Sequence, residues 1–269
     1  MIGAIFGDIV GSVYEFDNHR SKEFPLFRED CEFTDDSVMT VAVAEALLAH
    51  RREDGAEAFK EKLIDSMHKW GHAYPYAGYG CRFGWWLTLY SREPYNSFGN
   101  GSAMRVSPVA WYAESLEEAM SLARASAEVT HNHPEGIKGA EVTAGAIFLA
   151  RAGATLEQIR SFVECFYDLD FTMDEIRPTY RFNETCQDTV PQAMEAFLES
   201  GSFEDCIRTG VSVGGDTDTL CAICGAVAEA YYGLTDAERE VALSRLDAPL
   251  REVAEAFAGR YMGSGEGKR

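Results

Sequence analysis

Two aspartates stand two positions apart in the segment VGGDTDTLCAICGA, residues 213–226. Asp216 and Asp218 are each followed by a threonine, and a run of small residues typical of a packed helix comes next. Two carboxylates this close repel each other unless a positive charge lies beside them. The pattern therefore predicts a cation that holds Asp216 and Asp218 at the start of a helix.

A second acidic cluster lies much earlier in the chain, in the segment EFTDDSVMT. Thr34, Asp35 and Asp36 precede an apolar helix that we expect from about Val38. A single acid there would be explained by helix capping, with Thr34 or Asp35 as the N-cap, and by the helix dipole. Two hydroxyl–carboxylate clusters together favour a metal site. Their hard oxygen donors suit Mg²⁺ or Mn²⁺ better than zinc, and the clusters are compatible with two ions about 4 Å apart.

The DTDT segment has two other possible interpretations. An EF-hand loop counted from Asp216 would need an oxygen ligand at Leu220, a glycine at Cys221 and a glutamate at Val227, so that interpretation fails. A phosphatase-type DxDxT motif with Asp216 as nucleophile stays open. It has Leu220 in place of the final threonine, and SVGG is a poor buried strand.

Two further segments could contact a ligand. FGNGSAMRVSP, residues 98–108, has Gly99 and Gly101, which can adopt positive φ and expose N–H groups to a diphosphate. Alone, that segment is more typical of an ordinary loop. THNHPEG places His131 and His133 before a helix expected around Pro134. With no third soft ligand for zinc, a capping role and a ligand contact remain equally open for the histidines.

The elements that must position these residues are helices. Apolar residues follow a three-and-four spacing in TLEQIRSFVECFYDL, residues 155–169, and no strand with a period of two is evident. We expect Pro191 to open a helix that Gly201 closes. The sequence predicts one all-α domain over residues 1–262, a compact orthogonal bundle of many helices, and a disordered tail over 263–269. Capping boxes are predicted for three pairs: Thr155 with Gln158, Ser115 with Glu118, and Thr235 with Glu238.

Composition restricts the partners. The chain of 269 residues is 46% hydrophobic, which is typical of a globular protein. A formal net charge of −20 argues against a nucleic-acid partner, although a phosphate-bearing small molecule can still bind through a metal. No signal peptide or membrane-spanning run is recognisable. Seven scattered cysteines, an odd number, indicate reduced thiols and a cytoplasmic protein, with Cys221 and Cys224 packing a helix. We expect a monomer or a weak homo-oligomer.

The segments GDIVGSVYE, FTDDS, GNGSAMR, THNHPEG and GGDTDT occur in this order along the chain. Together they resemble the ADP-ribosylglycohydrolase family, which includes the dinitrogenase reductase-activating glycohydrolases. The resemblance extends from about Ile2 to about Gly233, and its specificity lies in the order of the motifs rather than in any one of them.

The resemblance implies an all-α fold with two Mg²⁺ or Mn²⁺ ions at the base of a cleft. It also implies roles for residues at matching positions. The implied metal ligands are Thr34, Asp35, Asp36, Asp216, Asp218 and Thr219. The implied substrate contacts are Asn100, Gly101, Ser102, Met104, His131 and the backbone of Gly215. Glu15 matches an acidic flap position, and Glu15 and Asp36 are the candidates for the catalytic acid–base and electrostatic roles.

The implied reaction is hydrolysis of a glycosidic or ester bond of ADP-ribose, in an ADP-ribosylated protein or a small conjugate, with release of ADP-ribose. Residues 66–92 contain no Asp or Glu, whereas the nitrogenase-activating members use a further aspartate in that segment. Arginine specificity is therefore not carried over. Two alternatives are an aspartate-based phosphohydrolase and a non-catalytic ADP-ribose-binding module.

Overall fold

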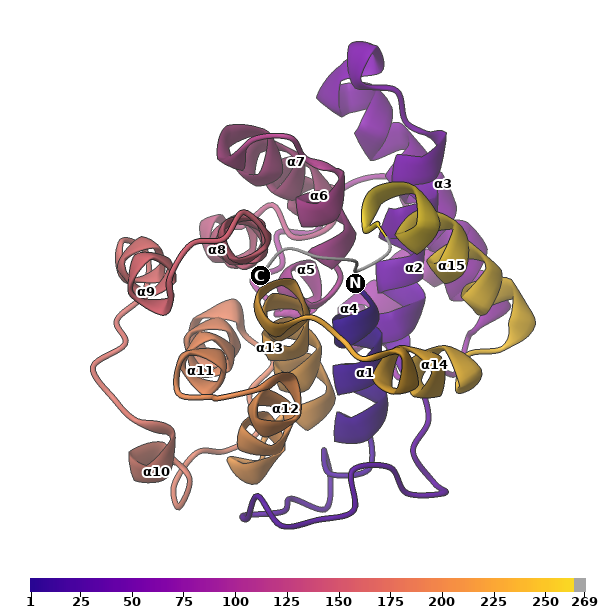
Figure 1. The fold of residues 1–269 in the computed structure, drawn as a ribbon. Coiled ribbons are helices and arrows are strands. Elements are labelled where there is room, and N and C mark those ends of the chain that lie inside the picture. The colour runs from indigo at the N-terminus through magenta and orange to yellow at the C-terminus, as the bar shows by residue number, and fades with distance from the viewer. Residues whose placement is uncertain (264–269) are drawn as a thin grey trace.

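The computed structural model describes residues 1–263, which form a bundle of α-helices around a shared core (Figure 1). No β-strand occurs in that part of the chain, where the isolated bridge between Gly99 and Thr185 is the only β-type pairing. The prediction of an all-α fold is therefore confirmed. Of the tail expected to be disordered, residues 264–269 lie outside the described part. The elements are α1 (Ile2–Gly11), α2 (Asp35–Ala49), η1 (Arg52–Asp54), α3 (Gly55–Ala73), α4 (Cys81–Thr88), α5 (Gly101–Met104), α6 (Ser107–Tyr112), α7 (Leu116–Glu128), α8 (Pro134–Arg151), α9 (Leu156–Glu164), α10 (Met173–Ile176), α11 (Cys186–Leu198), α12 (Phe203–Ser212), α13 (Thr217–Tyr232), α14 (Asp236–Ser244) and α15 (Ala248–Tyr261).

Helices α1 and α13 lie side by side in the middle of the molecule (Figure 1). Every residue of α1 is buried, and glycines spaced four apart face the backbone of α13. A Cβ atom added to Gly3 would lie 2.3 Å from the carbonyl oxygen of Gly225, and one added to Gly7 would lie 2.0 Å from that of Cys221. One added to Gly11 would lie 2.4 Å from the carbonyl oxygen of Thr217. The two helices are thus antiparallel and touch backbone to backbone, which only glycine permits.

The remaining helices surround this central pair. Helices α8, α11 and α12 pack on α13, while α2 packs on α1, α3, α6 and α15. The buried apolar side chains form one contiguous cluster that includes residues from Met1 to Phe257. The starts of α2 and α13, where the two acidic sequences lie, are therefore both fixed to this core.

Several helix boundaries follow the sequence rules. Complete capping boxes occur at Thr155 with Gln158 and at Thr235 with Glu238, as predicted. The third predicted box is half formed, because the Ser115 hydroxyl caps α7 but the Glu118 carboxylate accepts from the backbone N–H of Glu114. Side-chain contacts can therefore redirect half of a capping box without moving the helix start.

Other boundaries differ from the prediction. Thr34 is the N-cap of α2, one of the two caps predicted, and accepts a hydrogen bond from the N–H of Asp36 at 3.2 Å, so the helix begins at Asp35 rather than near Val38. Helix α11 begins at Cys186, so Pro191 lies inside the helix and does not open it. Proline removes the helical partner of the carbonyl four residues before it. That carbonyl belongs to Gln187, which is exposed, so water can replace the missing donor. The same helix ends at Leu198, before Gly201.

The cysteines and the apolar helices agree with the composition. All seven cysteines are free thiols, and Cys221 and Cys224 are buried in α13, as expected of helix-packing residues. Among residues 1–263, no helix combines the length and hydropathy that crossing a bilayer requires.

We predict that Gly7→Ala lowers the free energy of unfolding by about 3 kcal/mol, because the new methyl group would overlap the carbonyl of Cys221. Urea denaturation followed by circular dichroism measures this change. The matched control is Gly259→Ala in α15, where an added Cβ meets no atom within 4 Å. That control should be neutral or stabilising by up to about 1 kcal/mol. Equal stability of Gly7→Ala and the wild type would contradict the backbone contact.

Candidate active site

A carboxylate on α1 links the two acidic clusters. Asp8 is fully buried and accepts hydrogen bonds from the N–H and Oγ1 of Thr34, at 2.9 and 2.7 Å. It also accepts from the N–H of Ser37 at 3.0 Å and from the Ser37 hydroxyl. Asp8 therefore fixes the first turn of α2 to α1. Asp8 is not among the site residues predicted from the sequence. Its position as the one acidic residue in the apolar helix IGAIFGDIVG could have indicated a role.

Carboxylates from distant parts of the chain meet at this point in two groups. One oxygen from each of Asp8, Asp36 and Asp218 lies within 4.8 Å of the others, and so do oxygens of Glu15, Asp216 and Asp218. Asp218 belongs to both groups. The structure thus brings together acidic residues of both predicted clusters with Glu15, and adds Asp8.

One oxygen of this assembly lacks a hydrogen-bond partner among residues 1–263. Asp36 is 2% exposed, and its Oδ2 accepts from the Thr219 hydroxyl at 3.1 Å. Its Oδ1 is buried and accepts no hydrogen bond from any residue of the described chain. A buried carboxylate oxygen without a partner is costly, and a cation would offset that cost. With carboxylate and hydroxyl oxygens as the available donors, the residues fit a hard divalent ion such as Mg²⁺ or Mn²⁺.

The protein itself supplies little positive charge here. No carboxylate of this assembly forms an ion pair with a Lys, Arg or His among residues 1–263. Burial, followed by the charge of Asp218, raises the pKa of Asp36 well above its ordinary value. Burial and neighbouring Asp216 do the same for the pKa of Asp218. Burial also raises the pKa of Asp216 to about 6, although the amide of Asn100 donates to its Oδ2 at 2.7 Å.

Glu15 lies at the rim of this assembly. It is partly exposed, and burial followed by the charges of Asp218 and Glu184 raises the pKa of Glu15 to about 8. It belongs to the flap, which we define as residues 12–34 between α1 and α2. A group that is half in contact with solvent and half in contact with the buried acids is well placed to exchange a proton.

Hydrogen bonds from Asn18 and Arg20 attach the middle of the flap to the rest of the molecule. The side chain of Arg20 donates to the carbonyls of Arg177 at 2.6 Å and Tyr180 at 2.8 Å, and also to that of Val213. The amide of Asn18 donates to the carbonyl oxygen of Glu15 at 2.8 Å. These bonds fix the backbone that carries Glu15 against the turn before α13.

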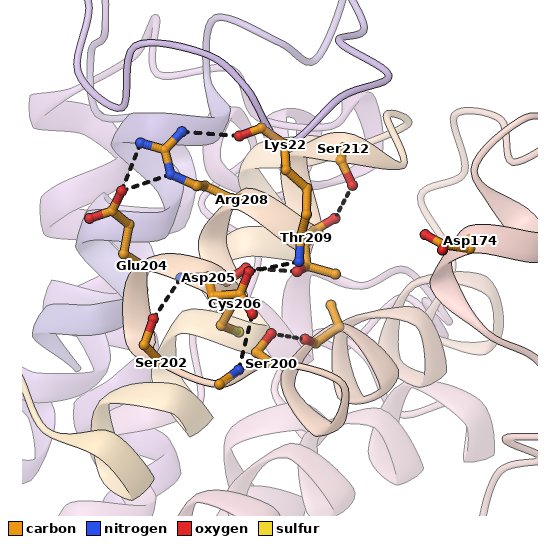
Figure 2. Close-up of polar contacts among 12 residues, drawn as sticks. Lys22, Asp174, Ser200, Ser202, Glu204, Asp205, Cys206, Arg208, Thr209 and Ser212 are labelled. Atoms are coloured by element: carbon orange, nitrogen blue, oxygen red, sulfur yellow. Dashed lines mark hydrogen bonds and ion pairs between the residues drawn. The ribbon is translucent and has the colours of Figure 1, made fainter.

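A second attachment lies further along the flap, on α12. Lys22 forms an ion pair with Asp205 at 2.7 Å (Figure 2). Arg208 donates to the carbonyl of Lys22 at 3.1 Å and to that of Phe24 at 2.8 Å, while Glu204 binds the same guanidinium. Both attachments follow Glu15 in the chain, so Glu15 lies between the end of α1 and the anchored part of the flap.

The other predicted metal ligands occupy the edges of the assembly. Asp35 is partly exposed, and its N–H donates to the carbonyl of Ala77 at 2.8 Å. Asp35 lies outside both close carboxylate groups. Burial, followed by the charges of Asp218 and Asp8, nevertheless raises the pKa of Asp35 well above its ordinary value. The hydroxyl of Thr34 is engaged by Asp8. The ligand roles of all six residues stay predictions, and Thr34, Asp35 and Thr219 lie outside the two close carboxylate groups.

The predicted substrate contacts divide into two sets. Asn100 binds Asp216, Met104 accepts a weak contact from the Thr219 hydroxyl at 3.8 Å, and Gly101 lies against His131. These residues adjoin the acidic assembly.

The second set serves the loops themselves. Ser102 is fully buried and its hydroxyl donates to the carbonyl of Gly136 at 2.7 Å. Gly215 has a φ of 81°, and its N–H donates to Asn18 Oδ1 at 3.0 Å. In this structure, Ser102 holds the glycine loop on α8, and Gly215 holds the flap. The two predicted histidines differ in their contacts. His133 is the N-cap of α8 and accepts a hydrogen bond from the N–H of Glu135. His131 lies against Gly101.

A family model described as ADP-ribosylglycohydrolase matches residues 1–268. The chain belongs to the ADP-ribosylglycohydrolase family. Among curated members of the family, mouse ADP-ribosylhydrolase ARH3 is 29% identical over 317 residues, covering 87% of this chain and 83% of the mouse protein. The ADP-ribosyl-(dinitrogen reductase) glycohydrolase of Rhodospirillum rubrum is 27% identical over 266 residues, with 87% and 85% covered.

A third curated relative and a solved structure are also similar to this chain. ADP-ribosylarginine hydrolase Tri1 of Pseudomonas putida is 24% identical over 267 residues, covering 87% of this chain and 70% of that protein. A solved ADP-ribosylglycohydrolase-related protein complex is 26% identical, with a TM-score of 0.68 and coverage of 96% and 94%. The family's fold, confirmed here, also weakens the phosphatase interpretation, because helix α12 and not a strand precedes Asp216.

We predict that the metal-free protein becomes less stable as pH rises from about 5.5 to about 8.5. The carboxyl pKa values of Glu15, Asp216 and Asp218 are higher in the folded chain than their ordinary values, so the folded chain binds more protons in this window. Stability then falls as these protons are lost. Thermal unfolding in EDTA measures the effect.

Mg²⁺ or Mn²⁺ should restore stability at the alkaline end, and Asp218→Asn should make the pH dependence in EDTA shallower. A melting temperature in EDTA that stays constant or rises with pH would contradict this electrostatic description.

Proposed function

We propose that this chain is a divalent-metal-dependent hydrolase that cleaves a glycosidic or ester bond of ADP-ribose and releases ADP-ribose. The observation that carries the proposal is the pair of carboxylate groups that share Asp218, with the buried Oδ1 of Asp36 lacking a partner. Family membership supports the reaction class. We further propose that residues 1–262 act as one domain, since a single core includes residues from Met1 to Phe257.

The residues proposed to hold two Mg²⁺ or Mn²⁺ ions come from the starts of α2 and α13. When bound, such ions supply positive charge and Lewis acidity beside the scissile bond. The protein's own contribution is to keep the donors in place through Asp8, through Asn100 on Asp216, and through the contact between Thr219 and Asp36. The proposed ligands are Thr34, Asp35, Asp36, Asp216, Asp218 and Thr219.

Proton transfer is assigned to Glu15 and charge stabilisation to Asp36. Glycoside cleavage proceeds through an oxocarbenium-like state, in which a carboxyl group exchanges a proton with the leaving group or with water. Glu15 is partly exposed and held by the flap, so it can reach both. Asp36 is buried and bound to Thr219, which suits an electrostatic role better than proton transfer.

The substrate is proposed to be an ADP-ribosylated protein or a small ADP-ribose conjugate. The glycine loop with Asn100, Gly101, Ser102 and Met104, together with His131, is the proposed contact surface for the diphosphate and ribose. The names of the bacterial relatives refer to ADP-ribosyl-dinitrogen reductase and ADP-ribosylarginine. Residues 66–92 of this chain contain no acid, so the leaving group has to be found by experiment.

The test is direct detection of released ADP-ribose by liquid chromatography and mass spectrometry. The substrates are an ADP-ribosyl-arginine peptide, an ADP-ribosyl-serine peptide and O-acetyl-ADP-ribose, each with Mg²⁺, with Mn²⁺ and with EDTA. Release from one substrate that EDTA abolishes would establish the reaction and name the leaving group. Binding of ADP-ribose without release from any substrate would favour the binding module, and inorganic phosphate as product would favour the phosphohydrolase.

Glu15→Gln should lower kcat on the accepted substrate by about 100-fold or more, because it removes the proposed acid–base group while keeping its shape. The matched control is Glu184→Gln, an exposed neighbour whose charge reaches Glu15. We expect the control to change kcat by less than about threefold and to shift the part of the pH–rate profile that depends on Glu15 to lower pH, because the charge of Glu184 raises the pKa of Glu15. Wild-type kcat in Glu15→Gln would remove Glu15 from the reaction.

A further inference from the structure

The arginine of the GNGSAMR segment is buried without a carboxylate partner. Arg105 is 1% exposed, and no Asp or Glu within the described chain forms an ion pair with it. Burial lowers the pKa of Arg105 to about 10, so the guanidinium still carries its charge at neutral pH. Its Nη2 donates to the carbonyl of Ser126 and to the hydroxyl of Thr130, both at 2.9 Å. A buried charge is costly, which raises the question of what this one positions.

The hydroxyl of Thr130 connects Arg105 to His131. Thr130 is fully buried, and its Oγ1 lies 2.7 Å from Nδ1 of His131. A hydroxyl has one proton to donate, and a guanidinium can only donate. Arg105 therefore donates a hydrogen bond to the oxygen of Thr130, and the hydroxyl hydrogen of Thr130 needs an acceptor of its own. Among residues 1–263, the recorded acceptor within reach is Nδ1 of His131. Nδ1 must then be unprotonated.

The other ring nitrogen of His131 faces the glycine loop. A Cβ added to Gly101 would lie 3.2 Å from Nε2 of His131, and one added to Gly99 would lie 3.5 Å from it. Within residues 1–263, the one hydrogen bond of the His131 ring is the contact of its Nδ1 with Thr130. Burial, followed by the charge of Arg105, lowers the pKa of His131 well below its ordinary value, so the ring is neutral at pH 7. With Nδ1 unprotonated, a neutral ring carries its proton on Nε2.

We infer that Arg105 and Thr130 are positioning residues that hold His131 as the Nε2–H tautomer, so that it presents a hydrogen-bond donor to a phosphate oxygen above Gly99 and Gly101. The opposite tautomer would direct a lone pair at the phosphate and repel it. The assignment of phosphate rests on the proposed function, whereas the assignment of the tautomer rests on the contacts alone. It also explains why a charged side chain is buried at the end of a segment, residues 99–105, whose other members carry no charge.

The experiment measures the tautomer and the affinity separately. Nitrogen NMR of protein labelled with ¹⁵N-histidine gives the protonation of each ring nitrogen at pH 7, and His131→Gln identifies the His131 signals. Calorimetry with ADP-ribose in Mg²⁺ gives the dissociation constant. The test variant is Thr130→Val, which removes the hydroxyl and keeps the shape. Thr130→Ser restores the hydroxyl, and Thr143→Val is a matched control because the buried Thr143 hydroxyl has no recorded partner.

The wild type, Thr130→Ser and Thr143→Val should all show a protonated Nε2 and an unprotonated Nδ1. Thr130→Val should show a mixture of tautomers and bind ADP-ribose about fivefold to tenfold more weakly, as expected from loss of one hydrogen bond. A protonated Nδ1 in the wild type, or an unchanged tautomer in Thr130→Val, would overturn the inference. If ADP-ribose does not bind the wild type, the proposed function fails, while the NMR result still decides the tautomer.

Discussion

The candidate active site depends on the direct contact between the backbones of α1 and α13. Three glycines of α1 allow this contact, and a methyl group at any of them would collide with a backbone atom of α13. At this separation Asp8 on α1 reaches both the first turn of α2 and the carboxylate of Asp218. A wider spacing would take α2 away from α13, and the two acidic sequences would no longer face each other. The packing of one helix pair therefore determines whether the acids can act together.

Bringing these acids together opposes folding in the absence of a cation. Five carboxylates from three parts of the chain meet, and no basic side chain among residues 1–263 pairs with them. The apolar core and the backbone contact must supply the free energy that holds them, and a bound divalent ion would return part of it. Metal affinity and fold stability are therefore linked, because an ion that binds these carboxylates in the folded chain also offsets their mutual repulsion. The anchored flap belongs to the same balance, because it keeps Glu15 beside Asp216 and Asp218.

Much of this arrangement could be predicted from the sequence, for local reasons. Short segments, in which neighbouring residues interact, were enough to predict the two hydroxyl–carboxylate clusters, the caps at Thr155 and Thr235 and the all-α class. The prediction for Pro191 was wrong because helix α11 begins earlier, at Cys186, and Gln187, whose carbonyl loses its helical partner, is an exposed residue.

Asp8 and Arg105 could not be assigned for a different reason. The partners of Asp8 lie 26 and 29 residues away, and those of Arg105 are Ser126 near the end of α7 and Thr130 just after it. The spacing of neighbouring residues in the sequence does not predict such contacts, although an acid in an apolar helix indicates that a distant partner exists. The four-residue spacing of Gly3, Gly7 and Gly11 was visible in the same way, but its meaning required the facing helix.

The most direct test of the central claim is a count of bound ions. Metal-free protein would be titrated with Mn²⁺ while electron paramagnetic resonance measures the free ion. Two ions per chain are expected in the wild type, one in Asp36→Asn, and none at comparable affinity in Asp218→Asn, because Asp218 belongs to both carboxylate groups. Binding of no ion or a single ion by the wild type, or of two ions by Asp218→Asn, would contradict the account.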